Sequence, residues 1–167
     1  TTQSITVQKL ATTTTISTAA TTIRVDSKTT INGKVAGAEA PVNVTIHQQT
    51  YGKAIWTILT HLQTDQNGIF SYNHSFSIAG AYQFKAECNS DDVYQASTSN
   101  TILIIAKFNS TISLSTDNPQ ISLGDTTTLS GSIYPAGYGA VATIEYKLNS
   151  GSWTLIAHTF TDENGVY

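Results

Sequence analysis

Apolar and polar residues alternate with a period of two along several short segments of this chain. The clearest alternations place apolar residues at Val42, Val44 and Ile46, at Tyr82, Phe84, Ala86 and Cys88, and at Ile31 and Val35 on either side of Gly33. Such alternation is typical of β-strands that have one face on a core, and no segment keeps apolar residues at helical spacing. Turn-forming sequences separate the segments, notably Gly37 to Pro41, Tyr51-Gly52-Lys53, Asp65 to Gly68 and Ala79-Gly80. We therefore predict an all-β chain.

Two blocks of sequence recur in the same order. IRVDSKTTINGKV at residues 23–35 resembles ISLGDTTTLSGSI at residues 121–133, and WTILTHLQTDQNGIF at residues 56–70 resembles WTLIAHTFTDENGVY at residues 153–167. The offsets between the copies differ by a single residue. A fixed period on this scale is typical of tandem domain repeats.

The ends of the chain follow the same period, since SITVQK at residues 4–9 resembles ILIIAK at residues 102–107. We expect residues 1–11 to hold the last strand of a preceding repeat and residues 12–107 to form a complete repeat. Residues 108–167 then form a partial second repeat. On this interpretation the chain is a window from a longer array.

About seven short strands in roughly 96 residues is typical of a sandwich of two packed sheets. The segment GAYQFKAECNSDDVYQASTSN at residues 80–100 resembles the closing part of prokaryotic immunoglobulin-like repeats, and Trp56 with Thr-Asp-Gln-Asn-Gly at residues 64–68 is similar to another recurrent block of them. The resemblance implies tandem immunoglobulin-like β-sandwich domains of bacterial or archaeal cell-surface proteins. It also implies that Tyr82 fills the tyrosine-corner position of such sandwiches.

The composition fits a surface rich in hydroxyl groups rather than charges. Charged residues make up 11% of the chain, against ~25% in ordinary soluble domains, and the net charge is −3. The few basic residues are scattered, which argues against nucleic-acid binding. No apolar run approaches the ~20 residues that span a bilayer, so we expect no membrane span in this stretch.

Calcium is the one cofactor that the acidic residues of the sequence suggest. Asp65 and Asn67 precede Gly68 in a sequence that recurs at residues 162–165, and Asp91 with Asp92 forms the densest acidic spot. Carboxylate and amide oxygens suit calcium, but the spacing lacks the further ligands of a calcium loop. We favour hairpin turns, in which Asp caps its own turn and Asn-Gly supplies positive φ angles.

No catalytic residue emerges from the pattern. The histidines lack the spacing of a zinc site, no serine stands in a nucleophile elbow, and Cys88 lies on the inward face of its strand. A single cysteine cannot form an internal disulfide, and here it is expected to act as a small hydrophobe. The predicted structural core comprises Trp56, Tyr82, Phe84, Cys88 and Trp153.

Three N-x-[ST] sequons begin at Asn43, Asn73 and Asn109. They are candidate glycosylation sites if the organism glycosylates exported proteins. Their use would place the protein outside the cell.

These patterns favour a non-catalytic structural repeat of an extracellular surface protein, as a stalk, surface layer or filament subunit. Its partners would be neighbouring repeats or identical subunits, and Ser4–Lys9 could act as a donated strand. One alternative is an adhesin module that binds glycan or protein through the loops at residues 47–54 or 89–96. Another is an accessory repeat of a secreted enzyme.

Overall fold

The computed structural model describes residues 8–39, 41–135 and 139–167, and every regular element in those ranges is a β-strand. The chain divides after Lys107 into two compact units. The all-β prediction is therefore confirmed. The predicted strand over Ser4–Lys9 lies mostly outside the described residues. Just after it, Leu10 forms a parallel bridge to Tyr94.

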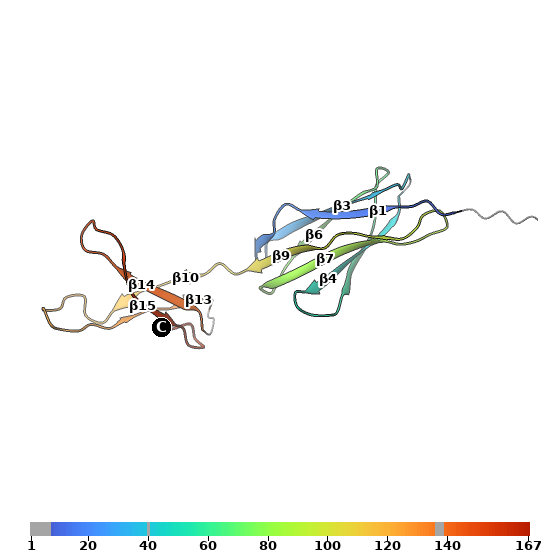
Figure 1. The fold of residues 1–167 in the computed structure, drawn as a ribbon. Coiled ribbons are helices and arrows are strands. Elements are labelled where there is room, and N and C mark those ends of the chain that lie inside the picture. Colours follow the sequence, from blue (N-terminus) through green and yellow to red (C-terminus); the bar gives the residue numbers. More distant parts are fainter. Residues whose placement is uncertain (1–7, 40, 136–138) are drawn as a thin grey trace, which may run out of the picture. The chain divides into compact units, whose positions relative to one another are not determined.

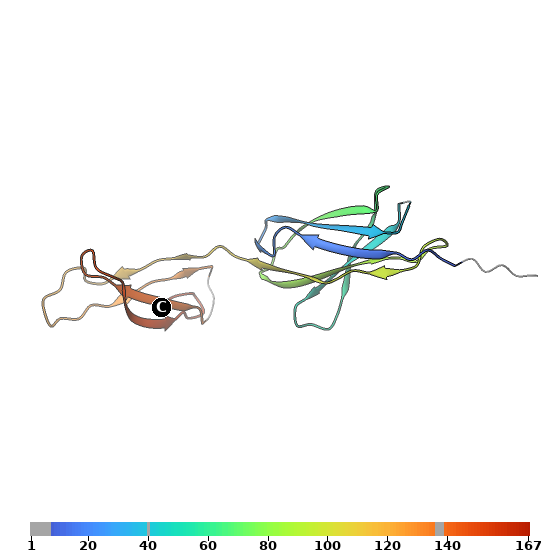
Figure 2. The ribbon, with the colours of Figure 1, turned by 45° about the horizontal axis from the view of Figure 1, so that its top comes forward.

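The strands of the first unit form two sheets (Figures 1 and 2). The smaller sheet has the order β1-β3-β6, and the larger has the order β2-β9-β7-β4-β5 with β8 paired to β7. The strands are β1 (Thr13–Thr18), β2 (Thr22–Arg24), β3 (Lys28–Ala36), β4 (Asn43–Thr50), β5 (Thr57–Gln63), β6 (Ile69–Ser75), β7 (Gly80–Cys88), β8 (Ser97–Thr98) and β9 (Ile102–Lys107). All pairings are antiparallel except that β2 runs parallel to β9.

Both sheets contribute to one buried core, as in a β-sandwich. Ile31 and Phe70 come from the smaller sheet, and Val44, Phe84 and Ile104 come from the larger one. Each is almost completely removed from water. Burying a side chain of this size contributes roughly 1.5–3 kcal/mol before entropy costs, so this shared core is what joins the two sheets.

The period-two alternation appears as predicted along β7, and along β4 with the exception of Thr45, which is buried as well. Val44 and Ile46 are fully buried, as are Phe84 and Ala86 on the adjacent strand, where Ala86 stands opposite Ile46 and Phe84 opposite Gln48. A β-bulge in the β4–β5 pairing lies between Ile46 and His47. Such a bulge places an extra residue in one strand and changes the direction of the side chains that follow.

A glycine on β3 leaves room for an aromatic ring from the next strand. Gly33 pairs with Phe70 in the β3–β6 register, and a Cβ built on Gly33 would lie within 2.1 Å of the Phe70 ring. The buried ring therefore occupies the space that any other residue at position 33 would need.

The second unit contains shorter strand pairs. Its strands are β10 (Thr111–Ile112), β11 (Ser115–Thr116), β12 (Leu129–Ser130), β13 (Ile133–Tyr134), β14 (Val141–Tyr146) and β15 (Thr154–Phe160). They pair antiparallel as β10 with β13, β11 with β12, and β14 with β15. The β14–β15 pairing carries a bulge between Ile144 and Glu145.

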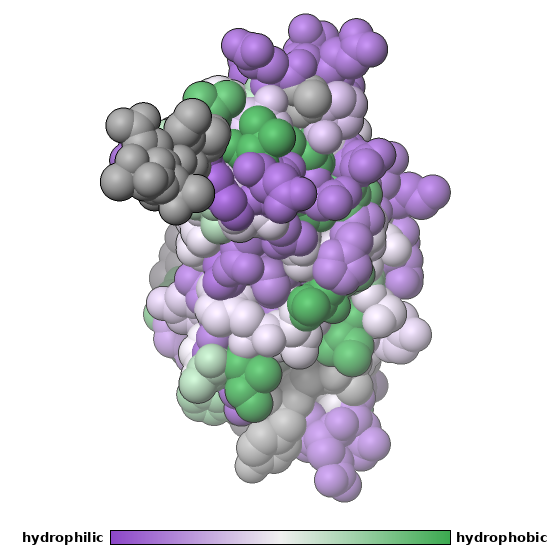
Figure 3. Space-filling view, turned by 90° about the vertical axis from the view of Figure 1, so that its right-hand side faces the viewer, coloured by the Kyte–Doolittle hydropathy of each residue, from purple (hydrophilic) through white to green (hydrophobic). Residues whose placement is uncertain are grey.

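Hydrophilic and near-neutral residues cover most of the face drawn in Figure 3, with smaller hydrophobic groups between them. Threonines occupy exposed positions on the strands, as Thr13 and Thr15 of β1 illustrate. Because Thr suits a pleated half-exposed surface, a face of this kind remains hydrated with few charges.

Candidate functional site

The repeated Asp-x-Asn-Gly segments form tight turns. Both the Asn67 and the Ile69 backbone N–H groups donate to Asp65 Oδ1 at 2.8 Å, and Gly68 has a φ of 75°. The corresponding N–H groups after Asp162 donate to its Oδ1 at 2.9 Å, and Gly165 has a φ of 78°. One oxygen of each carboxylate is thus held by the turn itself.

Asp91 has the same kind of role in the loop at residues 89–96. Its Oδ1 accepts hydrogen bonds from the backbone N–H groups of Tyr94 and Val93 at 2.6 and 2.8 Å. These bonds, the one from Tyr94 foremost, lower the pKa of the Asp91 carboxyl because they stabilise its charged form. Within residues 8–39, 41–135 and 139–167, neither Asp92 nor any other acidic residue joins a group of three metal-ligating side chains.

The predicted core residues divide into buried and exposed groups. Phe84 and Cys88 are buried, and desolvation raises the pKa of the Cys88 thiol. Tyr82 is half-buried, and its hydroxyl donates to the Ile78 carbonyl oxygen at 3.0 Å, which is the kind of backbone bond that a tyrosine corner makes.

The prediction that the two tryptophans lie in a core is wrong. Trp153 is 62% exposed and Trp56 is only half-buried. Trp56 immediately precedes β5, which is an edge strand of the larger sheet and, among the described residues, has a paired neighbour on one side alone. Each ring instead lies beneath a lysine ammonium group, Lys85 at 5.2 Å and Lys147 at 5.0 Å from the ring centroid.

A charged cluster that the sequence did not reveal lies on the outward face of β4 and β7. Glu87 accepts a 2.6 Å hydrogen bond from Lys85 Nζ and lies 3.1 Å from His47 Nε2. The Lys85 hydrogen bond is the main reason that the pKa of Glu87 is lowered. This cluster could be predicted only from the strand register, since His47 stands opposite Lys85 although the two are about forty residues apart in the sequence.

The remaining histidines have separate surroundings. The ring of His61 lies 3.0 Å from the Thr45 hydroxyl, and that of His158 lies 3.1 Å from the Thr143 hydroxyl. His74 packs edge-on against Phe76, with ring centroids 4.6 Å apart, and burial lowers its pKa. These contacts give the histidines packing and hydrogen-bonding roles within the sheets.

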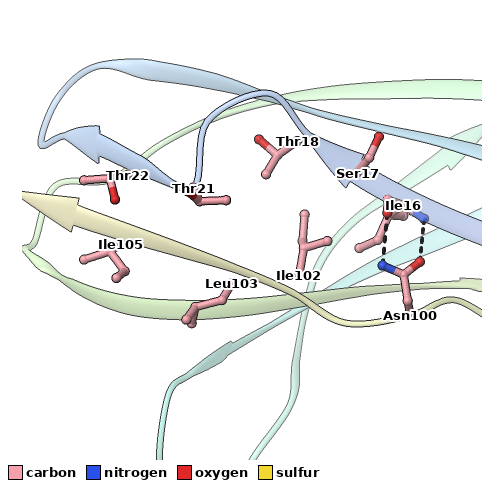
Figure 4. A pocket seen from close by; sticks show the side chains of 9 residues that line it. All are labelled: Ile16, Ser17, Thr18, Thr21, Thr22, Asn100, Ile102, Leu103 and Ile105. Carbon is pink, nitrogen blue, oxygen red and sulfur yellow. Dashed lines mark hydrogen bonds between the residues drawn. The ribbon is translucent and has the colours of Figure 1, made fainter.

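A cleft of about 610 Å³ lies between β1 and β9 in the first unit (Figure 4). Its lining is aliphatic and hydroxyl-bearing: Ile16, Ser17, Thr18, Thr21, Thr22, Asn100, Ile102, Leu103 and Ile105. The Asn100 side chain bridges the cleft, because its Oδ1 accepts from the Ile16 N–H at 3.2 Å and its Nδ2 donates to the Ile16 carbonyl at 3.1 Å. The amide thereby makes the hydrogen bonds that a neighbouring strand would make at the edge of β1. The residues that line the cleft include no acid–base pair.

The predicted loop at residues 47–54 is shorter than expected, since residues 47–50 belong to β4. Another hollow, of about 380 Å³, borders this stretch and includes Ile55 in its wall. Ile55 and the nearby Tyr51 are exposed, and Gly52 between them adopts a φ of 79° at the tip of the loop. The loop at residues 89–96 also exposes an apolar side chain, Val93, and backbone hydrogen bonds tie this loop to Leu10.

All three sequon asparagines are exposed. Asn43 begins β4, Asn73 lies on β6 where its Oδ1 accepts from the Thr30 hydroxyl at 2.7 Å, and Asn109 follows the first unit. Their side chains are accessible to a glycosylating enzyme.

No protein-family model matches this chain, and no curated protein matches it either. The described residues include no helix with the length and apolar character to span a membrane.

Proposed function

We propose that the chain is part of a tandem array of immunoglobulin-like domains in an extracellular surface protein, where the domains act as structural, non-catalytic repeats of a stalk, surface layer or filament. The order of strands in the first unit and the backbone hydrogen bond of Tyr82 support the immunoglobulin-like interpretation.

The observation that carries the proposal is the agreement in register between the two units. Thr13 pairs with Ala36 in the first unit, and Thr111 pairs with Tyr134 at the corresponding positions of the second. The β4–β5 and β14–β15 pairs match at every position and share a bulge at the same place. Agreement of this kind supports two copies of one domain plan.

The use of polar groups supports a structural role. Thr64 Oγ1 accepts from the Val42 N–H at 3.0 Å, and Thr161 Oγ1 accepts from the Ala140 N–H at the same distance. In these bonds and in the two Asp turns, the recurring polar side chains accept hydrogen bonds from backbone N–H groups. A catalytic constellation would instead direct such groups toward a shared substrate position.

A binding role through the loop at residues 47–54 is the second candidate. Exposed Tyr51 and Ile55 beside a hollow favour it, since aromatic and aliphatic anchors are common in loops that bind partners. An adhesin could use such a loop while the sandwich serves as its scaffold.

Antibodies raised against this chain would test the proposal on intact cells of the organism that makes the protein. We expect immunogold labelling on the outer surface and loss of the epitope when intact cells are treated with protease. A cytosolic protein serves as the control and should survive that treatment. An epitope that is labelled and cleaved only after lysis would contradict an extracellular role.

A further inference from the structure

The second unit exposes apolar residues at positions whose counterparts in the first unit are buried. Leu114 is 57% exposed, whereas Ile16 at the corresponding position of the first unit is 4% exposed. Leu129 is exposed as well, whereas its counterpart Ile31 is fully buried. Contiguous exposed apolar surface of this kind generally marks a place where another element binds.

The first unit shows which element covers these positions. There, β7 pairs with β4 from Val44 to Thr50, and β9 pairs with β7 in turn. The inward residues of these two strands, such as Phe84 and Ile104, complete the core. In the second unit β14 corresponds to β4, and within the described residues it pairs with β15 alone.

Several apolar and aromatic residues of the second unit, exposed or half-buried, line a hollow of about 260 Å³. Ile112, Leu114, Ile144, Trp153 and Tyr167 contribute to its lining. It adjoins the unpaired edge of β14, so an element that entered it would meet both apolar side chains and free backbone groups. A flat apolar face of a second copy would fill the hollow but leave that strand edge unpaired, which disfavours it as the occupant.

We propose that this face of the second unit binds a pair of antiparallel β-strands with the pattern of residues 80–107, one of which pairs with β14 in the register that joins β7 to β4. The occupant is a polypeptide segment whose inward positions carry an aromatic residue followed by small aliphatic ones. This inference rests on the proposed equivalence of the two units. Strand addition of this type combines main-chain hydrogen bonds for affinity with side-chain pockets for specificity.

A synthetic peptide of residues 80–107, titrated into the whole chain under reducing conditions, tests the proposal. Trp153 lines the hollow, so its fluorescence in a Trp56→Phe variant reports binding to the second unit. A Trp153→Phe variant retains only Trp56 and reports any exchange of the peptide into the first unit. We expect saturable one-to-one binding seen by Trp153 and no change in the signal of Trp56.

Changes in the peptide provide matched controls that leave the protein intact. A peptide with Phe84→Asp should bind about tenfold more weakly or worse, because it places a charge at an inward anchor position. A peptide with Gln83→Asp adds the same charge on the outward face, at a position that would stand opposite Lys147, and should bind at least as tightly as the original.

Three results of the titration would overturn the proposal: no binding at all, equal binding of the Phe84→Asp peptide, or a signal confined to Trp56. A dimer of the chain in light scattering that the peptide fails to dissociate would do the same, since a second copy would then occupy the face. None of these results bears on where the protein is located, so the proposed extracellular role is tested separately.

Discussion

Replacing Gly33 with alanine tests whether the Phe70 ring occupies the space of the missing side chain. The added Cβ would lie 2.1 Å from the ring, so the ring must move by more than an ångström within a closely packed core. Overpacking of this kind costs about 1–3 kcal/mol, and the large displacement points to the upper end. The lower backbone entropy of alanine in the unfolded chain offsets about 0.5–1 kcal/mol, leaving a net loss of about 2 kcal/mol.

The interaction between the two positions is measured by a double-mutant cycle. Phe70→Ala alone should cost about 3–5 kcal/mol, because it leaves a cavity in the core. In that background Gly33→Ala meets no ring and should be neutral or stabilising by up to about 1 kcal/mol. The expected coupling free energy is therefore roughly 2–3 kcal/mol.

Equilibrium unfolding in urea, followed by Trp56 fluorescence in a Trp153→Phe background, supplies the four free energies of unfolding. The Trp153→Phe change removes the signal of the second unit and lies outside the first. If Gly33→Ala has the same effect whether or not Phe70 is present, the steric reasoning is refuted.

Three further predictions concern the first unit. Thr64→Val should lower the free energy of unfolding by about 1–3 kcal/mol, because the buried Val42 N–H loses its acceptor, and Thr64→Ser should retain most of the stability in the same urea assay. Trp56→Ala should lower the free energy of unfolding by roughly 1–2 kcal/mol, because its ring is only half-buried, whereas Phe84→Ala should lower it by about 3–5 kcal/mol. Equal losses for the two variants would show that Trp56 is a core residue after all. His74 has a pKa below 6.5 in the folded state, so its neutral form stabilises the protein fully above that pH, and this contribution is lost as the pH falls below 6.5 toward the folded-state pKa. Stability curves of His74→Phe should accordingly fall less steeply than those of the wild type as the pH is lowered through 6.5, and parallel curves would contradict the assignment.

The alternation of apolar residues was enough to predict the strands and much of the buried core. Val44, Ile46, Phe84 and Ala86 are inward as expected, because a period of two directly encodes which face of a strand meets the core. The Asp65 turn was predictable for a similar reason, since its chemistry is confined to five neighbouring residues.

Features that depend on distant strands were not predictable. The position of Trp153 depends on which strand lies at a sheet edge, and the contact of Glu87 with His47 depends on the register between β4 and β7. The bridge from Asn100 to Ile16 joins residues 84 positions apart. Local sequence periodicity carries no information about such distances.

The two units agree most closely where side chains support the backbone, and they differ where side chains face solvent. Thr64 and Thr161 accept equivalent hydrogen bonds, yet His47 on β4 is replaced by Glu145 on β14. In the first unit His47 lies beside the carboxylate of Glu87, and a glutamate in its place would repel that carboxylate. A ligand-specific role, if the array has one, should therefore be sought at the outward positions that differ between units, whereas the shared positions serve the stability of every unit.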